Sequence, residues 1–172
     1  MTHFFRRKLP ALLFSLMIGG AVQAQKAVKR FIKKYEQIAV ESMQKHSIPA
    51  SLILGVSIVE SAAGESAIAK ALRNFFGVKG KNISSKEKLG YQSAYKEYVS
   101  DEASFEHFCQ ILMKKRFYVK MKACADYKQW LKAMNAASYA EAKQKWVDDI
   151  TRTIDKFELY KLDSPTNTLA VN

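Results

Sequence analysis

Apolar residues recur every three or four positions along most of this chain, a pattern that predicts a protein built mainly from helices. The first such stretch runs from about residue 28 to residue 43, with its charged residues mostly on the opposite face. Its apolar positions are Val28, Phe31, Ile32, Tyr35, Ile38, Ala39 and Met43. Later stripes predict a helix from Ser100 to about Phe117, a shorter one capped by Asp126, and a last one from about Tyr139. This content favours an all-α or α-rich α+β domain.

The stretch from residue 51 to residue 80 differs, because its first part is apolar on every side. Such a helix is expected to be buried, and Ser47 followed by Pro49 is a reasonable start signal. Its apolar residues are Leu52, Ile53, Leu54, Val56, Ile58 and Val59. The helix ends at Glu60. Burial disfavours the charged carboxylate and raises its pKa, as a general acid requires; alternatively, Glu60 is a solvated helix end.

The segments after Glu60 are shorter and more polar. Residues 65–73 predict a short helix, and Gly77 and Gly80 then break the pattern. Residues 81–100 are the least periodic part of the chain and predict a loop or small β-hairpin at one lip of a cleft. That segment contains Glu87, the only acid between Glu65 and Glu97.

The N-terminus predicts a secretory signal peptide over residues 1–24. Three basic residues precede an apolar run over residues 9–21, and Val22-Gln23-Ala24 carries the small residues expected before a cleavage point. We therefore expect the mature chain to begin at Gln25, to be periplasmic or secreted, and to have no stable membrane insertion. Residues 25–163 then form one domain and residues 164–172 a disordered tail.

Charge and cysteine content narrow the choice of partners. The formal charge of +12 falls to +9 when the three basic side chains of the signal are removed, and a basic exported protein suits a polyanionic partner such as cell wall. Cys109 and Cys124 are either a disulfide or free thiols, and no histidines are spaced to complete a zinc site with them. We expect no metal, no cofactor and no nucleic-acid partner, since no such motif is present.

One set of residues is more specific than the patterns. Glu60, Ser61, Gly64 and Ser66, followed by Asn74, Phe76, Gly77, Val78 and Lys79, resemble the glucosaminidase domain of peptidoglycan hydrolases, glycoside hydrolase family 73. The resemblance implies a lysozyme-like helical lobe with a small irregular or β-hairpin lobe. It also implies hydrolysis of the β-1,4 bond between N-acetylglucosamine and N-acetylmuramic acid in peptidoglycan, by a monomer. The family's catalytic acid corresponds to Glu60.

The resemblance also suggests the remaining site residues. Glu87 is the candidate base, although the substrate's own 2-acetamido group is an alternative. Substrate contacts are expected from Ser61, Asn74, Phe76, Gly77, Lys79 and Tyr139. Three positions depart from the family pattern and predict altered sugar subsites: Ala63 replaces an aromatic residue, Arg73 an asparagine, and Glu141 ends a reduced Gly-Tyr-Ala-Thr-Asp motif.

Other functions stay open at this stage. A lytic transglycosylase or muramidase shares the lysozyme-like plan, but the Gly-Leu-Met-Gln run expected after the acid is absent. A non-catalytic basic module that binds the wall would use the +9 charge alone.

Overall fold

The computed structural model describes residues 12–138 and 143–164, and its regular structure is helical. In chain order the helices are α1 (Leu12–His46), α2 (Ala50–Ser61), α3 (Ala67–Leu72), α4 (Ser85–Leu89), α5 (Asp101–Met113), α6 (Tyr118–Met121), α7 (Tyr127–Ala136), α8 (Lys143–Lys156) and the 3₁₀ helix η1 (Leu159–Asp163). The predicted disordered tail lies outside the described residues, apart from Ser164.

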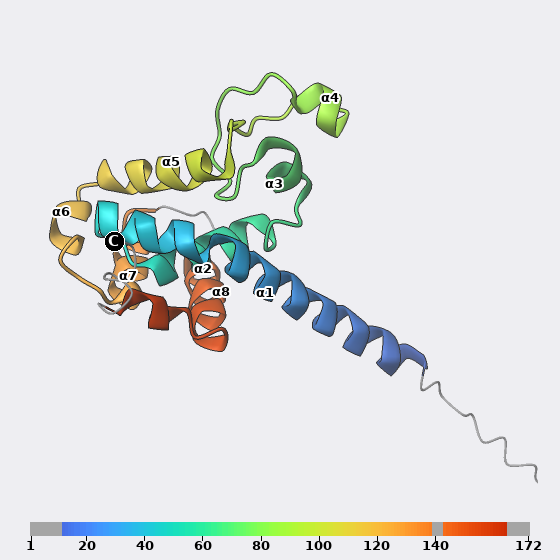
Figure 1. Cartoon of the computed structure of the whole chain (residues 1–172), viewed down its shortest axis with the longest axis horizontal. Helices are drawn as coiled ribbons and strands as arrows, with labels where there is room; N and C mark the ends of the chain where they lie inside the picture. Colours follow the sequence, from blue (N-terminus) through green and yellow to red (C-terminus); the bar gives the residue numbers. More distant parts are fainter. Residues whose placement is uncertain (1–11, 139–142, 165–172) are drawn as a thin grey trace, which may run out of the picture.

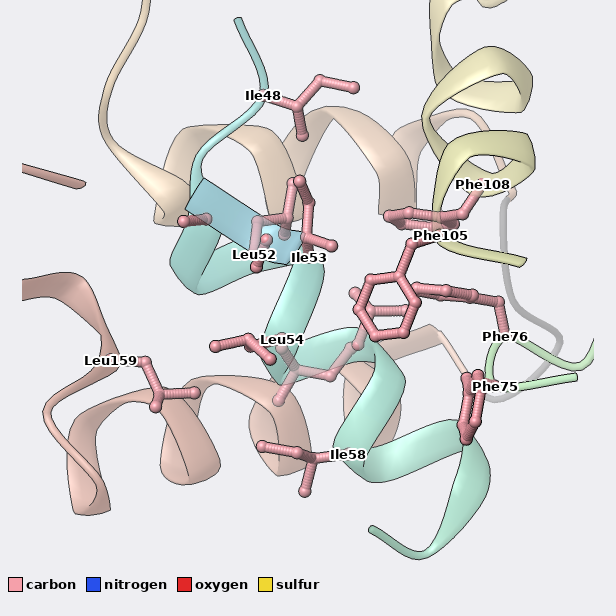
Figure 2. Packing of buried hydrophobic residues seen from close by; sticks show 14 of the residues in the cluster. Ile48, Leu52, Ile53, Leu54, Ile58, Phe75, Phe76, Phe105, Phe108 and Leu159 are labelled. Carbon is pink, nitrogen blue, oxygen red and sulfur yellow. The ribbon is translucent and has the colours of Figure 1, made fainter. Parts of the chain in front are cut away.

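Helix α2 lies at the centre of the larger lobe, as its apolar sequence predicts. It contacts α1, α7, α8 and η1 (Figure 1), and every residue from Ala50 to Ile58 is buried. Figure 2 shows its side chains Leu52, Ile53, Leu54 and Ile58 inside the core, with Phe105 and Phe108 of α5 nearby. Burying each of these large side chains stabilises the fold by about 1.5–3 kcal/mol, so α2 is the element around which the lobe assembles.

A glycine in the middle of α2 brings α8 very close. A Cβ on Gly55 would lie 2.6 Å from Cγ1 of Ile154 and 3.2 Å from Cγ2 of Ile150. The isoleucine stripe of α8 therefore packs directly on the α2 backbone. Trp146 belongs to the same buried stripe, one turn earlier. This close packing fixes the position of Trp146 relative to the end of α2.

The start of α2 depends on a residue from the far end of the chain. Pro49 precedes the helix and offers no capping side chain. Instead, the carboxylate of Asp163 in η1 accepts a hydrogen bond from the Ser51 backbone N–H at 2.9 Å and another from the Ser51 hydroxyl at 2.5 Å. Two donors at the buried helix start are satisfied in this way. Burial nevertheless raises the pKa of Asp163.

The smaller lobe, residues 74–100, is irregular rather than a β-hairpin. Its only β-pairing among the described residues is a single antiparallel bridge between Lys79 and Tyr95, and α4 occupies its tip (Figure 1). Hydrogen bonds from side chains take the place of the backbone hydrogen bonds that would pair two strands. The Asn82 amide donates to the carbonyls of Ser93 and Tyr95. Because so many backbone groups bond to side chains, a regular hairpin has few donors and acceptors left to pair.

A partly exposed carboxylate, that of Glu97, holds the start of α4. Glu97 accepts from the backbone N–H groups of Ile83 and Ser84, each at 3.1 Å, and from Lys88 at 2.9 Å. The Ser84 hydroxyl also donates to it. That hydroxyl, together with Lys88 and the backbone donors, lowers the pKa of Glu97 to about 2. Glu97 is therefore committed to holding this lobe together.

Several predicted helix boundaries are confirmed, and others differ from the structure. Ser100 and Asp126 cap α5 and α7, accepting from the N–H groups of Ala103 and Lys128. Helix α5 ends at Met113, earlier than predicted, because the chain turns there to bring the Tyr118 hydroxyl to the carbonyl of His46, at 2.9 Å. Helix α1 begins at Leu12 and runs through the predicted cleavage point. No helix within the described residues is long and apolar enough to cross a membrane.

The two cysteines are not bonded to each other. Cys109 is fully buried on α5, and Cys124 is partly exposed before α7. Burial raises the pKa of the Cys109 thiol to about 12, so it stays protonated and contributes as a small core residue.

Candidate active site

Glu60 lies in the last turn of α2, where the helix ends abruptly. Ala62 and Ala63 both adopt left-handed backbone angles, with φ of 51° and 53°, and Gly64 follows at φ 76°. The Ser61 hydroxyl donates to the Ser57 carbonyl at 2.5 Å and accepts from the Gly64 N–H at 2.8 Å. Ser61, a predicted substrate contact, is fully buried. The structure places it beneath the turn, where it fixes the backbone that follows Glu60.

A tryptophan from α8 holds one oxygen of the Glu60 carboxyl. The Trp146 indole N–H donates to Oε1 of Glu60 at 2.6 Å, and Trp146 itself is only 7% exposed. The hydrogen bond joins residues that are 86 positions apart in the chain. It orients the carboxyl, leaving Oε2 to face in another direction.

Glu60 combines access to solvent with a raised pKa. Its side chain is exposed, yet the protein around the carboxyl removes enough water to raise its pKa, outweighing the Trp146 hydrogen bond, which lowers it. The two observations agree because Trp146 and the turn at Gly77 lie against the carboxyl, while the rest of the side chain faces solvent. A carboxyl of this kind holds its proton at higher pH than a solvated one, as predicted from its position at the end of a buried helix.

The second oxygen of Glu60 faces the turn at residues 74–78. Gly77 has φ +63°, and a Cβ at that position would lie 3.4 Å from Oε2 of Glu60 and 4.0 Å from Cε1 of Tyr95. Asn74 is buried and holds this turn: its Nδ2 donates to the carbonyls of Val78 and Lys96, and its Oδ1 accepts from the Val78 N–H. Gly77 thus leaves room beside Oε2 that any side chain would fill.

The other predicted site residues lie in different surroundings. Phe76 is buried and stacks on Phe108, with ring centroids 4.2 Å apart, which makes it part of the core. Lys79 is exposed at the bridge to Tyr95. Glu87 is exposed on α4, which Figure 1 shows at the outer end of the smaller lobe, away from α2 and α8. Among the described residues, no hydrogen bond or ion pair joins Glu87 to Glu60. Tyr139 and Glu141 lie outside the described residues.

Two residues of this site were not singled out from the sequence. Trp146 lies on the apolar stripe of its helix and Tyr95 lies in the polar segment of residues 81–100, so neither position by itself indicates a catalytic site. One signal was available for Trp146, because a buried indole N–H nearly always finds an acceptor. The chain has only two tryptophans, and the other, Trp130, donates to the Cys124 carbonyl. Nothing in the sequence pointed to Glu60 as the acceptor for Trp146.

The arrangement can deliver a proton to a ligand bound beside Glu60. The Glu60 carboxyl has a raised pKa, and the Trp146 indole N–H fixes its Oε1. Its Oε2 lies beside Gly77. Within residues 12–138 and 143–164, no group of three or more histidine, cysteine or acidic side chains could hold a metal ion.

Two solved structures share this fold. The catalytic domain of the autolysin Auto from Listeria monocytogenes matches with a TM-score of 0.65 at 21% identity, over 79% of this chain and 87% of that one. The glycoside hydrolase domain of FlgJ from Salmonella typhimurium matches with a TM-score of 0.59 at 18% identity, over 82% of this chain and 95% of that one. At these identities the likeness is one of fold, and it confirms the predicted helical lobe with a small irregular lobe.

The sequence itself gives the family. A profile of the glucosaminidase family, described as mannosyl-glycoprotein endo-beta-N-acetylglucosaminidase, matches residues 36–159, well over half of the chain. The chain therefore belongs to the glucosaminidase family and is a glycoside hydrolase of the endo-β-N-acetylglucosaminidase kind. Among curated protein sequences none matches it.

Proposed function

We propose that this protein is an exported peptidoglycan hydrolase, with Glu60 as the general acid that cleaves the β-1,4 bond between N-acetylglucosamine and N-acetylmuramic acid. The observation that carries the proposal is the Glu60 carboxyl, whose pKa is raised by burial while Trp146 fixes its Oε1. Membership of the glucosaminidase family supports a cell-wall substrate. The basic charge of the chain supports attraction to an anionic wall.

The proposed chemistry begins with proton transfer from Oε2 of Glu60 to the glycosidic oxygen. The bond from that oxygen to the anomeric carbon breaks as the proton arrives, and the sugar ring takes on oxocarbenium character. Glu60 becomes a carboxylate during this step. The Trp146 N–H then donates to a charged acceptor, and hydrogen bonds to charged acceptors are stronger than those to neutral ones. Trp146 therefore stabilises the transition state more than the ground state.

The opposite face of the sugar needs a second group. Glu87 is one candidate, but its exposed position on α4 lies away from α2 (Figure 1). The substrate's 2-acetamido oxygen reaches the anomeric carbon without help from the protein, as in substrate-assisted glycosidases. We therefore assign the role of the second group to the acetamido oxygen and not to Glu87, which lies at the rim of the smaller lobe.

The remaining family residues act in two ways under this proposal. Ser61, Asn74 and Phe76 shape the site from beneath, because each is buried and bonded or stacked within the protein. Gly77 provides the space beside Oε2 of Glu60. Lys79 is exposed and free to contact sugar, and Tyr139 is proposed as a second sugar contact from the sequence resemblance.

Export by the predicted signal over residues 1–24 is compatible with the fold. Among the α1 residues whose side chains are described, which begin at residue 22, the first to pack against the core are Ala27 and Val28, and residues 22–26 are exposed. Cleavage before Gln25 therefore removes none of the described core. N-terminal sequencing of periplasmic or secreted protein tests the proposal, which predicts Gln25 as the first residue.

The bond that is cleaved is tested by mass spectrometry of muropeptides after digestion of purified wall. A reducing N-acetylglucosamine end is the expected product. A reducing N-acetylmuramic acid end would show a muramidase instead, and a 1,6-anhydro end a lytic transglycosylase. Binding to wall without any product would make the protein a non-catalytic wall-binding module.

A further inference from the structure

A cavity of about 430 Å³ borders the turn that follows Glu60, between α1, α3 and the start of α5. Glu60 does not line it, although Ala63 and Gly64 do. We call this cavity the cationic pocket, because four basic and two acidic side chains surround it. They are Arg30, Lys34, Lys70, Arg73, Glu65 and Asp101. Every lining residue lies after Gln25, so the pocket persists in the predicted mature chain.

The pocket has a rigid aromatic floor and an accessible basic rim. Phe31, Tyr35 and Phe75 pack against one another, with ring centroids 4.5–5.7 Å apart, and all three are buried. The four basic side chains are between 55% and 66% exposed. Since the floor is fixed by packing, the rim charges are held around a preformed hollow and remain within reach of a ligand.

The charges of the rim do not balance. Glu65 lies between Arg30 at 3.3 Å and Lys70 at 2.5 Å. Asp101 lies between Lys34 at 3.0 Å and Arg73 at 3.9 Å. Each acid thus meets two bases, and the rim keeps a surplus of two positive charges. Exposed ion pairs of this kind are weak, so a ligand carboxylate can join them without disrupting the fold.

The pocket is close to the catalytic acid along the chain. Ala63 is the third residue after Glu60, so their Cα atoms are at most roughly 11 Å apart. A strand bound at Glu60 therefore passes near the rim. In peptidoglycan, the substrate of the proposed function on which this inference rests, peptides with free carboxylates hang from alternate sugars of the strand.

We propose that the cationic pocket binds the carboxylates of the acidic stem peptide on the substrate strand. The glycan is neutral along its ring faces, whereas the stem peptide carries the negative charge that the rim complements. The pocket then selects strands that bear peptides over bare glycan.

The test compares two double variants of α1. Arg30→Gln/Lys34→Gln removes two rim charges, while leaving Glu65 with Lys70 and Asp101 with Arg73 and the Tyr35 hydroxyl. Lys29→Gln/Lys33→Gln removes the same charge from exposed positions of the same helix that do not line the pocket. Thermal unfolding of both checks that the fold is kept.

Each enzyme is assayed on uncrosslinked glycan strands that bear stem peptides, and on the same strands stripped by an amidase. The amidase frees a lactyl carboxylate on each stripped sugar, so these carboxylates are converted to methyl amides before the assay. Losing one exposed ion pair with the ligand should weaken its binding by a factor of about two to five. Arg30→Gln/Lys34→Gln removes two such pairs, so its kcat/KM on peptide-bearing strands should fall roughly 4- to 25-fold. It should match the wild type on stripped strands, and the Lys29/Lys33 variant should match it on both. An equal loss on both substrates, or no loss on either, would overturn the proposal.

A binding measurement separates this inference from the proposed function. Calorimetric titration of the released stem peptide should give weaker binding to Arg30→Gln/Lys34→Gln than to the other two proteins. That result supports the pocket even if the wild type hydrolyses neither substrate, in which case only the proposed function fails. Equal binding to all three proteins would overturn the inference and leave the hydrolase intact.

Discussion

Replacing Trp146 by phenylalanine removes the indole N–H that reaches Glu60 and keeps an aromatic ring in the same buried position. The substitution therefore tests the hydrogen bond more than the packing of α8. Two effects are expected. The catalytic rate falls, because the carboxylate that forms during proton transfer loses a donor. The basic limb of the pH–activity profile moves to higher pH.

The size of the rate effect follows from the change in charge on Glu60. A hydrogen bond to a neutral group contributes about 0.5–1.5 kcal/mol and one to a charged group about 1.5–3 kcal/mol. The difference, about 1–1.5 kcal/mol, is the part that favours the transition state and corresponds to a factor of roughly 5 to 13. Because the carboxyl is exposed and water partly replaces the lost donor, we expect kcat to fall about five- to tenfold.

The direction of the pH effect follows from the same bond. Donation by Trp146 stabilises the charged carboxylate and so lowers the pKa of Glu60 against the opposing effect of burial. Removing the donor raises that pKa further. The acid is active only when protonated, so activity persists to higher pH in the variant. Initial rates of wall solubilisation, measured across the pH range at saturating substrate, give both quantities.

The matched control is Trp130→Phe. The Trp130 indole donates to the Cys124 carbonyl at 2.8 Å in the fully buried core. This variant loses an equivalent hydrogen bond and should melt at a lower temperature, with an unchanged pH profile. If Trp146→Phe gave the wild-type kcat and a superimposable profile, the role assigned to Trp146 would be refuted.

Two further predictions concern the space beside Glu60 and the second catalytic group. Gly77→Ala and Gly90→Ala each place a side chain at a left-handed position, with φ of +63° and +79°, and each should lose about 1–2 kcal/mol of stability in thermal unfolding. Only Gly77→Ala should also reduce kcat/KM, because its methyl group reaches Glu60 while nothing lies near Gly90; equal activity of the two variants would count against the site. Glu87→Gln should keep at least a third of the wild-type kcat, since the acetamido group supplies the second function, and a loss above a hundredfold would make Glu87 the base.

The pattern of apolar residues was sufficient to predict α2, the central helix of the fold, and its burial. An uninterrupted apolar surface predicts burial whatever the partners are, and α2 is buried from Ala50 to Ile58. The caps Ser100 and Asp126 were also predictable, because a cap acts on its own first turn. The position of Glu60 left two alternatives open, a solvated helix end and a carboxyl with a raised pKa, and the structure agrees with the second.

The contacts that complete the site were not predictable in this way. Trp146 and Glu60 are 86 residues apart, and Asp163 and Ser51 are 112 apart. Periodicity tells which face of a helix is buried, but it does not tell which polar atoms from distant elements meet there. For the smaller lobe the sequence left a loop and a small β-hairpin open. The structure has the irregular form, in which Asn82 and Glu97 bond to the backbone in place of the strand pairing that a hairpin would need.

The central claim is that Glu60 donates the proton, and Glu60→Gln tests it most directly. The amide keeps the shape of the side chain and a carbonyl oxygen that accepts from Trp146, but it has no acidic proton. The account predicts a variant that melts no lower than the wild type, still binds purified wall, and loses roughly 10²- to 10⁴-fold in kcat. A folded Glu60→Gln protein that solubilises wall at the wild-type rate would contradict the account.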